Sequence, residues 1–176
     1  MFAFLKPEPA LSLAEFEAVL ARRSARWYSA CLRITRQPAL AEDAVQDALL
    51  KAWHRRGDFR GEAQLDTWIH RIAIHAAIDL MRRERPGLAL DAGDALATAL
   101  APDDPEAAQH SLDLARGLDA ALDRLTAMER LSFVLKHVEE WRLSEIAAEL
   151  ELSLDSVKQA LFRALRKLRP ALEEHR

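Results

Sequence analysis

The stretch DTWIHRIAIHAAIDLMRRERP, Asp66 to Pro86, has the period of an amphipathic helix with two different faces. Apolar side chains recur every three or four residues and share one face: Ile69, Ile72, Ala73, Ala76 and Leu80. Roughly opposite, at about 100° per residue, lies a row of aromatic and cationic side chains: Trp68, Arg71, His75 and Arg82, followed by Arg83 and Arg85. We expect the apolar face to be buried and this second row to be exposed.

The chemistry of the exposed row suits single-stranded nucleic acid. A guanidinium group pairs with phosphate, and a flat aromatic ring can cover an unstacked base. The alternative is an ordinary solvated helix face, on which the ring of Trp68 covers apolar surface.

Composition limits the remaining possibilities. The 176 residues could form one domain or two small ones, and the net charge of −3 excludes a uniformly basic nucleic-acid binder. The single cysteine, Cys31, cannot form an internal disulfide, and its apolar neighbours indicate a core residue in a reduced, cytosolic protein. We find neither a signal peptide nor an apolar run long enough to span a membrane.

Two further helices are predicted before Asp66. Ser12 and Glu15 form a capping box that begins a helix ending at Gln37-Pro38. The next helix, residues 39–56, buries an apolar set: Ala41, Val45, Ala48, Leu49, Ala52 and Trp53. Its outward side carries Asp43, Gln46, Asp47 and Lys51 and is acidic near its beginning. Acidic residues in a first turn favour the helix dipole, so this acidity has a structural explanation as well as a functional one. A glycine-bracketed loop, residues 57–64, follows.

The character of the chain changes after Pro86. Residues 86–115 contain no Lys or Arg, several aspartates, and prolines and glycines that interrupt a long helix. No strand-like alternation is present anywhere. The sequence therefore predicts an all-α protein of two small helical domains, residues 1–85 and 111–176, joined by a flexible acidic linker, residues 86–110.

The C-terminal domain contains a predicted helix-turn-helix. A leucine helix (Leu114, Leu118, Leu122 and Leu125) precedes a second capping box, Thr126 and Glu129. Two helices are then joined by the turn Glu151-Leu152-Ser153, with an expected core of Ile146, Ala147, Leu150, Val157, Leu161 and Leu165. The second helix exposes Ser156, Lys158, Gln159 and Arg163, and residues 158–169 contain five cations and no acid. A short helical hairpin without DNA-binding function remains the alternative.

Together these segments resemble the extracytoplasmic-function group of bacterial sigma factors, over nearly the whole chain. Region 2 of that family resembles AEDAVQDALLKAW and DFRGEAQLDTWIHRIAIHAAIDLMRRERP. Region 4 resembles LDRLTAMERLSFVLKHVEEW, LSEIAAEL and SVKQALFRALRKLR. The resemblance implies a promoter-specificity subunit with no catalysis and no cofactor or metal. Its implied partners are core RNA polymerase (the clamp helices of the largest subunit and the flap of the second), promoter DNA and an anti-sigma factor.

The resemblance also implies roles for individual residues. The residues at the polymerase-docking positions are Glu42, Asp43, Gln46 and Asp47. Capture of the unpaired −10 strand falls to Phe59, Arg60, Gly61, Glu62, Ala63, Trp68, Arg71, His75, Arg82 and Arg83. Recognition of the −35 element falls to Ser156, Lys158, Gln159 and Arg163, with phosphate contacts from Arg166 and Lys167.

The chain departs from the family pattern at several positions. His75 stands where the family usually has Asn, and Ala160 stands where its recognition helix often has Arg. Three positions that are commonly glycine are Glu140, Glu151 and Asp155, so the turn at Glu151 is expected to be strained or to adopt another conformation. An altered −10 preference and a weaker −35 contact follow as expectations.

Parts of the sequence are also compatible with two other functions. A self-contained helix-turn-helix regulator, with N-terminal helices for dimerisation or sensing, would need no acidic docking face. The sequence disfavours an enzyme built on His70, His75, Asp66 and Asp79. Two histidines five residues apart on a helix point about 140° apart, so they cannot share one metal ion.

Overall fold

The computed structural model describes residues 11–59, 64–84 and 120–173, with side chains as far as residue 169. All regular elements in these ranges are helical, which confirms the predicted all-α class. The chain divides into two compact units, an N-terminal unit of residues 1–84 and a C-terminal unit of residues 85–176. The predicted linker, residues 86–110, and the predicted core residues Leu114 and Leu118 lie outside the described residues. Among the helices described, none has the length and apolar content to cross a membrane.

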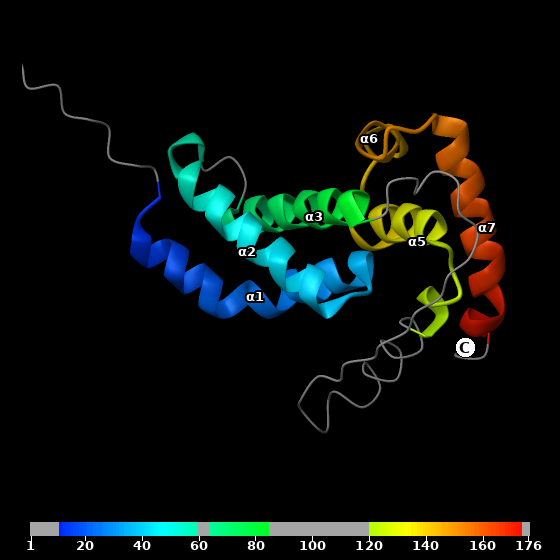
Figure 1. The fold of residues 1–176 in the computed structure, drawn as a ribbon, viewed down its shortest axis with the longest axis horizontal. Coiled ribbons are helices and arrows are strands. Elements are labelled where there is room, and N and C mark those ends of the chain that lie inside the picture. The colour runs from blue at the N-terminus through cyan, green and yellow to red at the C-terminus, as the bar shows by residue number, and fades with distance from the viewer. Residues whose placement is uncertain (1–10, 60–63, 85–119, 174–176) are drawn as a thin grey trace, which may run out of the picture. The chain divides into compact units, whose positions relative to one another are not determined.

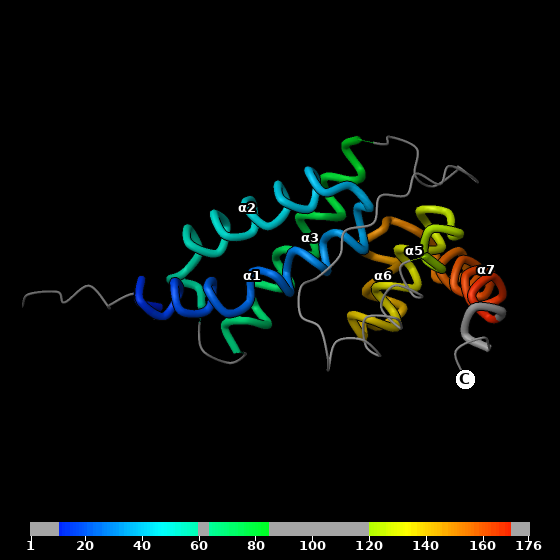
Figure 2. The backbone as a smooth tube through the Cα atoms, turned by 90° about the horizontal axis from the view of Figure 1, so that it is seen from below, coloured from blue at the N-terminus to red at the C-terminus, as the bar shows by residue number. Residues whose placement is uncertain are grey.

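The N-terminal unit is built from three long helices that lie side by side (Figures 1 and 2). They are α1 (Leu13–Thr35), α2 (Pro38–His54) and α3 (Leu65–Glu84), with a single 3-10 turn, η1 (Arg56–Asp58), after α2. The capping box at the start of α1 is confirmed: Ser12 Oγ accepts from the Glu15 N–H, and the Glu15 carboxylate accepts from the Ser12 N–H. Pro38 begins α2, where a missing N–H costs nothing.

Large side chains of α1 and α3 form the centre of this unit, whereas α2 contributes small ones. Trp27 and Ile34 of α1 and Ile69, Ile74 and Ile78 of α3 are almost completely buried. The buried face of α2 consists of Leu40, Ala41, Ala44, Ala48 and Ala52. Because alanine is short, α2 can approach both neighbours closely.

The buried faces differ in detail from the predicted ones. Ile72 and Leu80 are only half-buried, and the core instead includes Ile74, Ala77, Ile78 and Met81. Because α3 contacts both α1 and α2, its buried face is wider and rotated relative to a stripe chosen from one face alone. On α2, Val45, Leu49 and Trp53 are likewise half-buried.

The C-terminal unit consists of shorter helices packed against one long helix (Figure 1). The helix α5 (Ala127–Phe133) continues into a π-helical turn, η2 (Val134–Val138), and is followed by α6 (Leu143–Glu149) and α7 (Leu154–Glu173). The predicted capping box is confirmed at the start of α5, where Thr126 and Glu129 exchange hydrogen bonds. Leu122, Leu131, Leu135, Ile146 and Leu168 are fully buried between these helices.

A left-handed residue makes the turn between α6 and α7. Glu151 has φ 55°, and the N–H groups of Glu151 and Leu152 donate to the carbonyl groups of Ala148 and Ala147. This pair of bonds is the Schellman ending of a helix, which usually has glycine at the left-handed position. A side chain there costs about 1–2 kcal/mol, so the expected strain at Glu151 is present.

The other two positions that are commonly glycine behave differently from each other. Glu140 is also left-handed, with φ 58°, whereas Asp155 lies in the first turn of α7 and needs no glycine.

The inward face of α7 carries Val157, Ala160, Leu161, Ala164 and Leu168. Burial of Ile146, Ala147, Leu150, Val157 and Leu161 confirms most of the predicted helix-turn-helix core. The prediction for Leu165 is wrong, because its side chain is 42% exposed. Four residues turn a helix about 40° past a full circle, which carries Leu165 beyond the packed edge that Leu161 still occupies.

Candidate functional site

The aromatic and cationic row of α3 lies outside the core. Arg71 is exposed, and Trp68, His75 and Arg82 are half-buried. Arg82 lies 3.9 Å from Asp79, a partly exposed pair that holds it only weakly. Arg83 is also exposed. It follows Arg82 directly, and successive residues of a helix point about 100° apart, so Arg83 lies to the side of the row.

Trp68 is joined on this surface by Phe59, which follows η1. The two ring centroids are 5.4 Å apart and the ring planes are inclined by 45°. Both side chains remain half-exposed, so the pair forms an aromatic surface at the start of α3. The predicted loop residues Arg60, Gly61, Glu62 and Ala63 lie outside the described residues.

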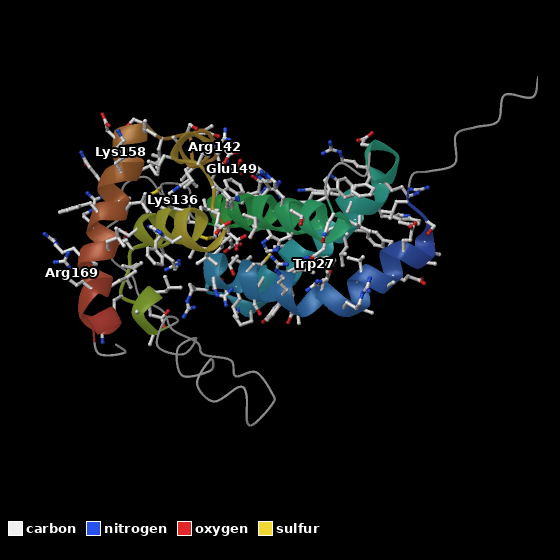
Figure 3. All side chains as sticks on the ribbon, turned by 180° about the vertical axis from the view of Figure 1, so that it is seen from behind. Trp27, Lys136, Arg142, Glu149, Lys158 and Arg169 are labelled. Atoms are coloured by element: carbon white, nitrogen blue, oxygen red, sulfur yellow. The ribbon has the colours of Figure 1, made fainter. Side chains whose placement is uncertain are left out.

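A buried carboxylate fixes the first turn of α3 against α1. Asp66 Oδ1 accepts a hydrogen bond of 2.9 Å from Nε1 of Trp27, whose side chain lies inside the unit (Figure 3). Asp66 Oδ2 lies 3.2 Å from Arg23 and 3.1 Å from Arg26. The sequence suggested Asp66 only as a neighbour of His70 and His75 in the enzyme hypothesis, and this contact could not be predicted because its partners are about forty residues away.

The acidic row of α2 faces outward. Glu42, Asp43 and Gln46 are exposed and Asp47 is half-buried. Since α2 begins at Pro38, its first turn holds no acid, and a helix-dipole explanation for this row is removed. Leu50, three residues after Asp47 and 59% exposed, adds an apolar side chain that sequence reasoning missed.

The outward side of α7 exposes Ser156, Lys158, Gln159, Arg163 and Arg166, and Lys167 is half-buried. Figure 3 shows Lys158 and Arg169 projecting away from the body of the unit. Ser153 caps α7: its Oγ accepts from the Ser156 N–H at 3.1 Å and lies 2.8 Å from Ser156 Oγ.

Two of the predicted DNA-binding cations are paired within the protein. Glu129 Oε2 lies 2.7 Å from Lys167 Nζ, and Glu129 Oε1 lies 3.4 Å from Arg163 Nε. Burial by itself raises the pKa of the Glu129 carboxyl, but hydrogen bonds from Lys167 and Thr126 and the charge of Lys167 outweigh it. The net pKa of Glu129 is therefore below its ordinary value of 4.5.

The position expected to carry a missing DNA contact faces inward. Ala160 is fully buried, so an arginine there would displace the core of the unit before it reached DNA. The expectation of a weaker −35 contact loses its basis at this residue. Sequence reasoning missed Phe162, which is 68% exposed on the outer side of α7, because an aromatic residue in an amphipathic helix is ordinarily assigned to the core.

The residues of the enzyme hypothesis do not gather. Asp66 is engaged by α1, and Asp79 lies beside Arg82. Within residues 11–59, 64–84 and 120–173, no group of three or more His, Cys, Asp or Glu side chains could hold a metal ion.

Both units match known sequence families. The family described as "Sigma-70 region 2" matches residues 20–86, and "Sigma-70, region 4" matches residues 115–168. The two matches together cover more than half of the chain, in the order in which the surfaces of α2, α3 and α7 occur.

Whole-length relatives and solved structures agree with these matches. The chain is 30% identical over 155 residues to the ECF RNA polymerase sigma factor SigW of Bacillus subtilis (84% of this chain, 83% of the relative). It is 33% identical over 163 residues to the RNA polymerase sigma factor CarQ of Myxococcus xanthus (90% of each).

Two solved structures share the fold. One is the sigma factor RpoE in complex with the anti-sigma factor NepR from Bartonella quintana, with TM-score 0.60 and 23% identity, covering 93% of this chain and 100% of that one. The other is CnrH in complex with the cytosolic domain of CnrY, with TM-score 0.51 and 25% identity, covering 93% and 90%. With a region 2 unit, a region 4 unit and relatives that match 84% and 90% of its length, the chain belongs to the sigma-70 family and is an RNA polymerase sigma factor of the extracytoplasmic-function group.

Proposed function

We propose that three helices of this sigma factor divide promoter recognition among them. The acidic row of α2 binds core RNA polymerase, the row of α3 captures the unpaired −10 strand, and α7 reads the −35 element. The observation that carries the proposal is the Phe59–Trp68 ring pair, which lies at the start of the helix that also exposes Arg71.

The ring pair supplies the energy that strand capture needs. Unstacking a base costs a few kcal/mol, and stacking on an aromatic side chain returns about 1–3 kcal/mol per base. Arg71 lies on the same face of α3 as Trp68 and contributes phosphate pairing, and His75 reads a base edge through its ring nitrogens. Arg60, Gly61, Glu62 and Ala63 belong to the same proposed strand-binding set, and Arg82 and Arg83 contact the backbone of the strand.

The polymerase-docking surface combines charge with one apolar anchor. Glu42, Asp43, Gln46 and Asp47 meet the clamp helices of the largest subunit, and the exposed Leu50 packs against an apolar residue there. A buried apolar anchor inside a polar rim is the usual source of binding energy at such an interface. Leu50→Ala therefore weakens core binding more than Leu13→Ala, an equally exposed leucine of α1 (54%).

The outer side of α7 provides the −35 contacts. Gln159 and Arg163 are suited to adenine and guanine edges in the major groove, and Arg166 to phosphate. Phe162, 68% exposed, offers apolar contact to a thymine methyl group. The flap of the second polymerase subunit binds the C-terminal unit of which α7 is part.

An anti-sigma factor is the expected regulator. The solved relative from Bartonella quintana is bound to one, and the exposed surfaces of α2 and α7 are those that such a partner must cover to block polymerase and DNA. The chain acts in the cytoplasm, as a binding subunit that performs no catalysis of its own and uses no cofactor.

Run-off transcription with core polymerase on a library of candidate promoters tests this function. Trp68→Ala is expected to lower transcription from duplex promoters and to recover on templates already opened at −10, since stacking then no longer has to offset base-pair opening. Arg55→Ala, an exposed arginine of the turn before Phe59, is the matched control and changes neither template. Absence of any transcript above the core-only background contradicts the proposal.

A further inference from the structure

The C-terminal unit contains one carboxylate at the meeting point of three interactions. Only 3% of the Glu129 side chain is exposed. Its Oε2 accepts hydrogen bonds from the Thr126 N–H at 3.0 Å and from Lys167 Nζ at 2.7 Å. Its Oε1 lies 3.4 Å from Arg163 Nε. Glu129 lies in the first turn of α5 and the two cations belong to α7, so the cluster joins α5 to α7.

The two cations differ in what they leave exposed. The charge of Lys167 is compact, and its ammonium group donates to the buried Oε2 of Glu129. Of the Lys167 side chain, 37% is exposed. Arg163 is 49% exposed and meets Glu129 through Nε, which lies 3.4 Å from Oε1. Because a guanidinium group is a rigid plane with five donors, an ion pair at Nε limits the directions in which the two terminal nitrogens can point.

Neutralising Glu129 does not require Arg163. One lysine at 2.7 Å already balances the charge of the carboxylate, so the cluster keeps one net positive charge, on Arg163. By contrast, Lys158 pairs at 3.4 Å with Asp155, whose side chain is 83% exposed, and such a pair is easily exchanged for a phosphate. Figure 3 shows Lys158 projecting away from the body of the unit.

From this arrangement we infer that Glu129 is a positioning residue for −35 recognition. It holds the Arg163 guanidinium at the angle that presents its terminal nitrogens to a base edge, and it withdraws Lys167 from DNA. The inference rests on the proposed placement of α7 at the −35 element. It assigns base discrimination to Arg163 and phosphate contact to Arg166, and it removes Lys167 from the DNA-binding set.

The test uses the full chain bound to core polymerase, on the promoter found in the library and on every single-base-pair change of its −35 element. Arg163→Ala is expected to lose discrimination at one base pair by about 5- to 150-fold, the range of a bidentate contact. Glu129→Gln keeps the size of the side chain but loses the charge. It is expected to lose discrimination at the same base pair, and the double variant is expected to lose no more than Arg163→Ala alone.

Glu145→Gln is the matched control, because Glu145 occupies the same capping position at the start of α6. It is expected to change binding equally for all sequences. A purely structural role for Glu129 predicts this same uniform change in Glu129→Gln, and that result overturns the inference.

Arg163→Lys keeps the charge and leaves Glu129 paired with Lys167, so it tests the inference even if Glu129→Gln fails to fold. Discrimination is expected to be lost although the salt dependence of binding is unchanged. Full discrimination in Arg163→Lys overturns the inference.

The salt dependence of DNA affinity distinguishes a cation that contacts phosphate from one that does not, and it is measured for Arg166 and Lys167. Arg166→Gln is expected to reduce the slope of log affinity against log salt by about 0.9, the value for one phosphate contact, and Lys167→Gln is expected to leave it unchanged. Equal slopes for the two variants overturn the withdrawal of Lys167. A wild-type holoenzyme whose binding is indifferent to every −35 change overturns the placement of α7 itself, a result that differs from retained discrimination in the variants.

Discussion

Replacing Asp66 by alanine is expected to destabilise the N-terminal unit by about 1–6 kcal/mol. The largest part comes from Trp27, whose fully buried indole N–H would lose its 2.9 Å partner, at a cost of about 1–3 kcal/mol. Arg23 and Arg26 are 50% and 58% exposed and return to water, so their pairs add only about 0–1 kcal/mol each. Loss of an acid from the first turn of α3 adds about 0.3–1 kcal/mol.

Urea unfolding followed by tryptophan fluorescence measures this change. Three of the four tryptophans, Trp27, Trp53 and Trp68, belong to the N-terminal unit, so the signal reports mainly on its unfolding. Asp66→Asn keeps an oxygen acceptor for the indole N–H and is expected to cost about 1 kcal/mol, mostly from lost charge.

Asp79→Ala is the matched control on the same helix, since its pair with Arg82 is long and partly exposed. It is expected to change the free energy of unfolding by less than about 0.5 kcal/mol. If Asp66→Ala costs no more than Asp79→Ala, the buried hydrogen bond does not hold α3 against α1, and the reasoning is refuted.

Three further predictions concern the C-terminal unit. Ala160→Arg is expected to lower its free energy of unfolding by at least about 2 kcal/mol, because a guanidinium would replace a fully buried methyl group, whereas Gln159→Arg on the exposed side changes it little. An equal thermal stability for the two variants would contradict the inward position of Ala160. Glu151→Gly is expected to raise the free energy of unfolding by about 0.5–1 kcal/mol, because relief of the left-handed strain is partly offset by the greater freedom of glycine in the unfolded chain. Asp155→Gly inside α7 is expected to lower it by about 1 kcal/mol, and shifts of the urea midpoint in the same direction for both variants would argue against this. Although burial works in the opposite direction, hydrogen bonds and a neighbouring positive charge hold the pKa of Glu129 below 4.5. Its contribution is therefore complete above pH 4.5 and lost as the pH falls through the lower folded pKa, so wild-type unfolding should show an acid-induced loss that Glu129→Gln lacks.

The sequence by itself determined the helices and most of their faces. Both capping boxes and the helix-turn-helix follow from patterns within a few residues, because a helix start and a 3.6-residue period are local properties. The exposure of Arg71 on α3 and of Gln159 on α7 could be predicted for the same reason.

The tertiary structure alone decided which neighbour each face meets. Periodicity gives an angle about the axis of one helix, but the width of the buried face depends on how many helices pack against it. For this reason Leu165 is exposed and Ala160 is buried, against expectation. The bonds from Trp27 to Asp66 and from Lys167 to Glu129 span 39 and 38 residues, a separation at which no sequence pattern joins a carboxylate to its partner. Only packing brings these groups together, because a buried carboxylate is stable only where hydrogen-bond donors surround it and the other helices supply most of them.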